Sequence, residues 1–159
     1  NTVRMEGFDF NYKQALTLLP PWARGVQVFA NGSALRATGG ATSNFTPVPR
    51  TASWGVSLTR EKYVLRMNWN YRGRQRLSQV AAGRSIDSAT YNWYAKRLFL
   101  DLTGEYKFRK KFALFANLRN FNNATEDFEV KNPFTPAHAR FRQSQDFGSL
   151  WTFGVKSSF

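Results

Sequence analysis

The sequence predicts an all-β fold of about seven long antiparallel, meandering strands that form part of a transmembrane β-barrel. Three observations lead to this fold class. Apolar and polar residues alternate with a period of two, the alternating segments are long, and the connections between them alternate between short and long. Aromatic residues make up 16% of the 159 residues, yet the mean hydropathy is only −0.48. A wall with one apolar and one polar face produces this combination.

The alternation is clearest in residues 63–72, 94–108 and 147–159. Weaker alternation predicts further strands at 3–16, 25–37, 50–60 and 112–120. In 25–37, Phe29 and Leu35 interrupt an otherwise polar face. Most of these segments are about 9–13 residues long, close to the roughly 9–11 residues of a tilted membrane-spanning strand. Strands of soluble proteins average only about 5–6 residues.

The connections between the predicted strands are of two kinds. Short turns are expected at the two prolines 20–21 and at the basic stretches 60–62 and 109–111. Long polar loops are expected at 38–48, 74–92 and 121–146. Short and long connections alternate along the chain, as in outer-membrane barrels with short periplasmic turns and long outer loops.

Within the barrel interpretation, the two faces of each strand have different neighbours. Apolar and aromatic residues would contact lipid, those near the strand ends as interfacial girdles: Tyr63, Leu65, Met67, Trp69, Tyr71, Tyr94, Leu98, Leu100, Leu102, Tyr106, Trp151 and Phe153. The alternate residues would face the lumen, where they form a hydrated wall or contact a plug or substrate: Arg66, Asn68, Asn70, Arg72, Arg97, Asp101, Glu105 and Lys107.

Several functional classes are disfavoured by the residues present. Cysteine is absent and His138 is the single histidine, so neither a thiolate nor a multi-histidine metal site is predicted, and no cofactor is expected. Asp101 and Glu105 share a strand face about 13 Å apart, too far for a pair of glycosidase carboxylates. With no nucleophile elbow or phosphate-binding loop either, we do not expect an enzyme. The net charge of +13 suggests a polyanionic partner, but the basic residues are scattered and mostly lie opposite the aromatic face, so nucleic acid is disfavoured.

An ordered series of motifs resembles the closing section of TonB-dependent outer-membrane receptors. Residues 100–108 read LDLTGEYKF, and a basic turn leads to FALF at 112–115 and NLRNFN at 117–122. In the family an aromatic residue usually follows the Asn-Leu pair, whereas here Arg119 and Asn120 precede it. The ending FGVKSSF at 153–159 and the opening GFDF at 7–10, with a proline-bearing turn and Gly25, are also similar to segments of these barrels.

The resemblance implies a barrel of about 22 strands closed around an amino-terminal plug. It further implies active import of a small nutrient across the cell outer membrane, with energy supplied by TonB through the plug. Residues 1–159 would be the carboxyl-terminal part of that barrel, without the plug, and Phe159 would be the signal read by the barrel-assembly machinery. Outer-membrane lipid, this machinery and the TonB system are the implied partners.

Two alternatives remain open at the level of sequence. One is a small autonomous outer-membrane barrel or porin-like protein, which a signal peptide directly upstream of Asn1 would favour. The other is a soluble, basic β-protein that binds nucleic acid, which would not need detergent to stay in solution.

Overall fold

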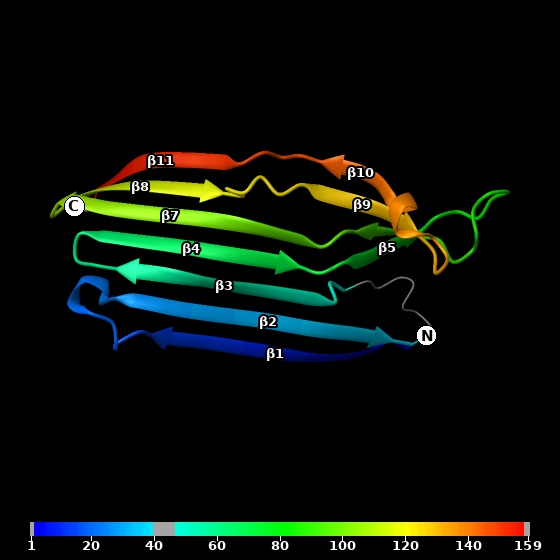
Figure 1. Ribbon diagram of the computed structural model, residues 1–159, viewed down its shortest axis with the longest axis horizontal. Coiled ribbons are helices and arrows are strands. Elements are labelled where there is room, and N and C mark those ends of the chain that lie inside the picture. The colour runs from blue at the N-terminus through cyan, green and yellow to red at the C-terminus, as the bar shows by residue number, and fades with distance from the viewer. Residues whose placement is uncertain (1, 40–46, 158–159) are drawn as a thin grey trace.

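The computed structural model describes residues 2–39 and 47–157, and in these ranges it contains 11 strands in two antiparallel sheets (Figure 1). Short 3-10 helices form at Pro21–Ala23 and Ala137–Ala139. The all-β, antiparallel fold class predicted from the sequence is confirmed. Within the described ranges, no helix has the length and apolar character that crossing a membrane requires.

The larger sheet, here called the main sheet, has the strand order β1-β2-β3-β4-β7-β8-β11. Each strand lies within or close to one of the predicted segments. The strands are β1 (Arg4–Ala15), β2 (Val26–Thr38), β3 (Arg50–Thr59), β4 (Tyr63–Arg72), β7 (Arg97–Arg109), β8 (Phe112–Arg119) and β11 (Leu150–Ser157). All neighbours pair antiparallel, from Arg4 opposite Thr38 at one edge to Ser157 opposite Phe112 at the other.

The smaller sheet, here called the distal sheet, extends the main sheet beyond a break. It contains β5 (Gln75–Gln79), β6 (Tyr91–Tyr94), β9 (Glu126–Lys131) and β10 (Phe141–Gln145), in the order β10-β9-β6-β5. This order matches β11, β8, β7 and β4 of the main sheet, and each distal strand is joined to its counterpart by a short connection. Figure 1 shows the distal strands at the right-hand end of the molecule.

The distal sheet corrects the prediction of long irregular loops at 74–92 and 121–146. These segments contain β5, β9, β10 and the first half of β6. The sequence of β9, EDFEVK, is mostly charged and has little strand propensity of its own. It forms a strand because β6 and β10 supply backbone partners on its two sides.

Two predicted strands also begin elsewhere in the structure. The segment 94–108 is divided, because β7 begins at Arg97 whereas Tyr94 ends β6 in the distal sheet. Tyr94 therefore does not share a strand with the other predicted girdle residues of 94–108. Its ring lies 4.8 Å from the ring of Phe128 and 4.6 Å from the guanidinium of Arg72. The last strand begins at Leu150 rather than at 147. Phe159 and most of the predicted 38–48 loop lie outside the described residues.

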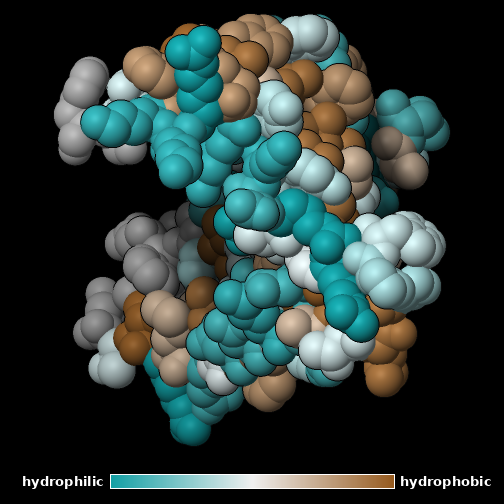
Figure 2. Space-filling model, turned by 90° about the vertical axis from the view of Figure 1, so that its left-hand side faces the viewer, coloured by the Kyte–Doolittle hydropathy of each residue, from teal (hydrophilic) through white to brown (hydrophobic). Residues whose placement is uncertain are grey.

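The main sheet is not built around an ordinary hydrophobic core. In the described ranges, the buried apolar residues are Ala23 and Ala113, and no side chain falls below 2% exposure. Large apolar side chains on the main-sheet strands are exposed instead: Phe8, Phe10, Tyr12, Trp54, Tyr63, Leu65, Leu98, Tyr106, Phe108, Phe112, Leu114, Trp151, Phe153 and Val155. Figure 2, which looks at the end with the short turns, shows hydrophobic residues at the upper right of the outline and a notch on the left. Burial of apolar surface within the chain therefore contributes little to this fold.

The two outer strands of the main sheet are the basis of a first prediction. Within the described residues β1 pairs only with β2, and β11 pairs only with β8, so each presents an open edge. Open edges beside an exposed apolar face pair with other chains. We expect the isolated 159-residue chain to self-associate in water and to form mixed oligomers when refolded into detergent, as measured by light scattering after size-exclusion chromatography. A monodisperse monomer that stays soluble without detergent would contradict this prediction.

Candidate ligand-facing groove and strand junction

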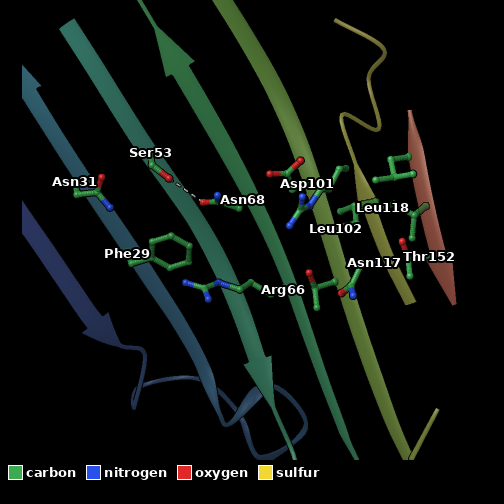
Figure 3. Close-up of a pocket in the computed structure, with 13 residues that line it drawn as sticks. Phe29, Asn31, Ser53, Arg66, Asn68, Asp101, Leu102, Asn117, Leu118 and Thr152 are labelled. Atoms are coloured by element: carbon green, nitrogen blue, oxygen red, sulfur yellow. Dashed lines mark hydrogen bonds between the residues drawn. The ribbon is translucent and has the colours of Figure 1, made fainter. Parts of the chain in front are cut away.

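The polar face of the main sheet forms a groove of about 710 Å³. Side chains from β2, β3, β4, β7, β8 and β11 line it, as Figure 3 shows: Phe29, Asn31, Ser53, Arg66, Asn68, Asp101, Leu102, Thr103, Asn117, Leu118, Arg119, Leu150 and Thr152. Residues directly opposite one another on neighbouring strands share a face of the sheet. The register therefore places Asn31 on the same face as Ser53, Asn68 on the same face as Asp101, and Asn117 on the same face as Thr152.

A chain of hydrogen bonds crosses the groove from β3 to the end of β8. The Ser53 hydroxyl lies 3.0 Å from the side-chain oxygens of both Asn68 and Asn70. Asn68 Nδ2 donates to Asn70 Oδ1 at 2.9 Å, and Asn70 Nδ2 donates to Asp101 Oδ2 at 3.0 Å. The other oxygen of Asp101 accepts from the backbone N–H of Asn120 at 3.0 Å. The Asp101 carboxylate is therefore held by a donor from β4 and by a donor from the residue that follows β8, and it belongs to a connected polar network.

The structure places the predicted lumen-facing residues along one face but in three groups. Arg66, Asn68 and Asp101 line the groove, and Asn70 joins them through hydrogen bonds. Toward the short turns, Glu105 accepts a hydrogen bond of 2.7 Å from Lys156 Nζ, while Lys107 is exposed.

The third group lies next to the distal sheet. The guanidinium of Arg72 is 2.6 Å from Glu126 Oε1, and both side chains are largely shielded from solvent. Arg97 donates to the carbonyl oxygen of Ala124 and lies over the ring of Phe99. These two arginines therefore tie the main sheet to the segments beyond the break rather than presenting free charge to the groove.

Two phenylalanines on the polar face cover glycines of neighbouring strands. Phe29 lies over Gly55, where an added Cβ would approach its ring to 2.6 Å, and Phe115 lies over Gly154 with a corresponding distance of 2.5 Å. Each ring also carries a cation, because Arg66 lies 4.6 Å from the Phe29 centroid and Lys156 lies 5.3 Å from that of Phe115. From the sequence, Phe29 only interrupted a polar face, and Phe115 was not singled out as a site residue. The signal that marks both is a glycine directly opposite in register.

The other face of the main sheet gathers the predicted apolar residues of β4, β7 and β11. Along β4, Tyr63, Leu65, Met67, Trp69 and Tyr71 lie opposite Tyr106, Gly104, Leu102, Leu100 and Leu98 of β7. Trp151 and Phe153 reach the same face through their pairing with Leu118 and Ala116. Trp54 and Trp69 stack on this face with their centroids 6.5 Å apart. Leu102 shares the apolar face by register and also borders the groove.

Asn120 organises the junction between the two sheets. It is buried and adopts a φ of 53°, a left-handed conformation that Asn tolerates better than most residues. Its Nδ2 donates to the carbonyl oxygens of Gly148 at 2.9 Å and Ala124 at 3.2 Å, and its Oδ1 accepts from the N–H of Ala124 at 2.9 Å. One side chain therefore connects the end of β8, the start of the distal segment and the residues that precede β11.

Asn122 continues the ladder with its side chain where β8 has ended. Its Oδ1 accepts from the N–H of Leu100 at 2.9 Å, and its Nδ2 donates to the carbonyl oxygen of Leu98 at 3.0 Å. The amide thus replaces a missing backbone neighbour of β7. The sequence predicts a strand at 112–120 and a family resemblance at 117–122, but it does not reveal that Asn120 and Asn122 hold this junction together.

The described residues contain no cluster of three or more side chains suited to bind a metal ion. His138 is exposed in the short helix Ala137–Ala139, away from the groove residues named above. The groove is thus a polar, hydrogen-bonded surface with the Arg66 and Arg119 cations and the Asp101 carboxylate. It is suited to contact a polar partner or a hydrated solute. Comparison of the chain with protein-family models, curated proteins and solved structures found no match.

A second prediction concerns Asn120. The substitution Asn120→Gly keeps the left-handed backbone but removes the side-chain hydrogen bonds. We therefore expect it to lower the free energy of opening of the junction by about 1–3 kcal/mol. Asn120→Ala should cost about 1–2 kcal/mol more, because alanine resists a positive φ. The effect should be measured as the free energy of opening of the junction, by hydrogen exchange in detergent.

Asn123 offers a matched control, since it also has a positive φ, of 48°, but is exposed. Its amide donates to Asp146 Oδ2 at 3.2 Å in an exposed position, where water can replace the bond, so Asn123→Ala should cost little more than the backbone strain. If Asn120→Gly left exchange at residues 120–125 unchanged, the bonding function assigned to Asn120 would be wrong.

Proposed function

We propose that this chain forms the carboxyl-terminal part of the barrel wall of a TonB-dependent outer-membrane receptor that actively imports a small nutrient. The observation that carries the proposal is the inverted chemistry of the main sheet. Its long strands present one exposed apolar face and one hydrogen-bonded polar face, with scarcely any buried apolar side chain between them in the described ranges. Lipid outside and a hydrated lumen inside give both faces a suitable environment.

The arrangement of the connections supports a defined orientation. The connections after β1, β3 and β7 lie at one end of the main sheet, and the distal sheet lies at the other (Figure 1). The connections after β3 and β7 are tight turns, whereas residues 16–25 between β1 and β2 form a longer connection than the short turn predicted at 20–21. The proposal assigns the first end to the periplasm and the second to the outside of the cell. Leu18 and Trp22, exposed in the turn between β1 and β2, then lie near the periplasmic boundary of the membrane.

The remaining parts of the proposal rest on the family resemblance of 100–122 and of the chain end. In this interpretation β1 and β11 pair with further strands of a barrel of about 22 strands. The groove contacts a plug domain outside this chain, and TonB acts through that plug. The barrel-assembly machinery reads the last strand and Phe159, and the function is transport rather than catalysis.

A third prediction tests which face contacts lipid. The experiment uses the parent protein, which is the complete receptor proposed to contain this chain, reconstituted into lipid with its other tryptophans replaced. The fluorescence of Trp69 should then be quenched by brominated acyl chains. A tryptophan placed at position 68 by Asn68→Trp should escape this quenching. Equal quenching at both positions would contradict the facing. No quenching at Trp69 would contradict it too, and would favour a soluble β-protein.

The same assignment has an energetic consequence that serves as an independent check. Met67→Arg would place a charge against hydrocarbon near mid-bilayer and should cost about 2–4 kcal/mol of folding free energy. Asn68→Arg, one residue away on the polar face, should cost far less because its charge stays hydrated. Urea titration in lipid vesicles measures both.

A fourth prediction separates an active importer from a passive barrel. Uptake of the nutrient by cells that express the parent protein should stop when the proton gradient across the inner membrane is collapsed, while binding at the cell surface continues. Uptake that follows the concentration gradient and persists without that energy would instead support the small barrel or porin-like alternative. The quenching experiment tests the membrane facing of the strands, and its result does not depend on whether uptake requires energy. The barrel part and the active-import part of the proposal can therefore fail separately.

A further inference from the structure

A second hollow, here called the distal pocket, has a volume of about 400 Å³ and lies on the distal sheet. Its lining includes Arg76 of β5, Tyr91 and Trp93 of β6, Lys131 of β9, and Arg140 before β10. The volume falls within the roughly 300–1,000 Å³ that is usual for small-molecule sites. The function proposed above assigns no ligand to this pocket.

Aromatic rings and cations alternate on this face of the distal sheet. Tyr91 lies opposite Lys131, and Trp93 lies opposite Arg76, so the register brings all four side chains to one face. The Lys131 ammonium is 4.3 Å from the centroid of the Trp93 ring, and the Arg76 guanidinium is 4.9 Å from that of Tyr91. The pocket thus has an aromatic floor with positive charge held against it.

Two of these cations have hydrogen-bond donors without acceptors in the part of the chain that the structure describes. The side chain of Lys131 is only 17% exposed, and its nearest carboxylate oxygen, Glu129 Oε2, lies 3.8 Å away, beyond hydrogen-bond distance. The other oxygen of Glu129 is already bonded to Arg74 at 3.1 Å. Arg140 uses its Nε to donate to the carbonyl oxygen of Thr135 at 3.0 Å, which leaves its two terminal amino groups. An ammonium and a guanidinium in a partly desolvated pocket bind strongly to an oxyanion.

The carboxylates near the pocket meet this need only in part, since Glu129 forms an ion pair with Lys131 but no hydrogen bond to it. Glu129 is not among the residues that line the pocket in the described ranges, and Asp87 accepts a hydrogen bond from Asn132 Nδ2 at 3.0 Å. Lys131 and Arg140 therefore line a pocket that has no acidic residue among its lining in the described part of the chain.

We propose that the distal pocket binds a small carboxylate attached to a planar or sugar ring, with Lys131 and Arg140 holding the carboxylate and Tyr91 and Trp93 contacting the ring. The proposal deepens the proposed function and rests on it in one respect, the assignment of the distal sheet to the outside of the cell. In that position the pocket would retain the nutrient before its passage through the barrel.

Lys131 also gives the site a characteristic pH dependence. Burial lowers the pKa of Lys131, and the nearby positive charges of Arg74 and Arg140 lower this pKa further, while Glu129 opposes them. Arg76 also lines the same pocket. Because the protonated ammonium binds the anion, affinity should be full below this pKa and should fall as the pH rises through it, at a lower pH than for an ordinary lysine.

The test is equilibrium dialysis of the intact protein in detergent micelles against two probes, salicylate for an aromatic acid and galacturonate for a sugar acid. At least one should bind, with its uncharged counterpart, salicylamide or galactose, bound about tenfold more weakly. Lys131→Gln and Arg140→Gln should each weaken binding of the acid by about tenfold. Lys131→Arg should retain binding and remove the fall in affinity at high pH, since arginine stays protonated.

Arg84→Gln is the matched control, because Arg84 is exposed in the segment between β5 and β6 and its loss changes the net charge equally. It should change affinity by less than about twofold. The proposal is overturned if neither acid binds, if the neutral counterparts bind equally well, or if Lys131→Gln binds like the unmodified protein. Binding on purified protein needs no energy source, so loss of this site and loss of energy-dependent uptake are distinguishable.

Discussion

The structure depends on the hydrogen-bonded ladder between neighbouring strands. With Ala23 and Ala113 as the buried apolar residues of the described ranges, the main sheet has little core to hold its strands together. What remains is an antiparallel register that runs unbroken through twelve residue pairs between β1 and β2 and ten between β4 and β7. In hydrocarbon every backbone N–H and C=O group must be paired in such a ladder, because no water is present to form a hydrogen bond with an unpaired group. The register also decides the faces, since a slip of one residue would exchange the apolar face for the polar one.

The pairing of glycines with aromatic rings gives one physical reason why this register is defined. Phe29 and Phe115 lie where only a glycine on the next strand leaves room for the ring, at Gly55 and at Gly154. A shift by one residue would set Phe29 against a side chain instead. The cations of Arg66 and Lys156 lie over the same rings, so the contact combines shape with charge. These contacts supply on the polar face some of the specificity that a packed core supplies in a soluble domain.

How much of this could be predicted from sequence depends on whether a signal is local. The main-sheet strands could be located because one face is consistently apolar over many residues, as in Tyr63–Arg72. The distal strand Glu126–Lys131 could not, because its residues favour a strand only when neighbours on both sides supply hydrogen bonds. The junction at Asn120 was equally hidden, since its partner Gly148 lies 28 positions along the chain. The groove residues Asn68 and Asp101 could be predicted from the period of two alone, whereas the distal pocket is formed by three strands, β5, β6 and β9, that the sequence did not reveal.

The junction at Asn120 marks the break between β8 of the main sheet and β9 of the distal sheet. In the proposed barrel, a straight extension would carry the apolar face of β4 and β7 past the membrane and into water, at a cost that grows with each exposed side chain. The left-handed turn at Asn120 interrupts the ladder, and Asn122 satisfies the backbone groups of Leu98 and Leu100 that the interruption leaves open. Beyond it, Tyr94 is covered by Phe128 and Arg72, whereas Phe134 and Phe141 remain exposed. The amide side chains of Asn120 and Asn122 at the end of the main sheet are therefore followed by a second sheet of different chemistry, with its own pocket.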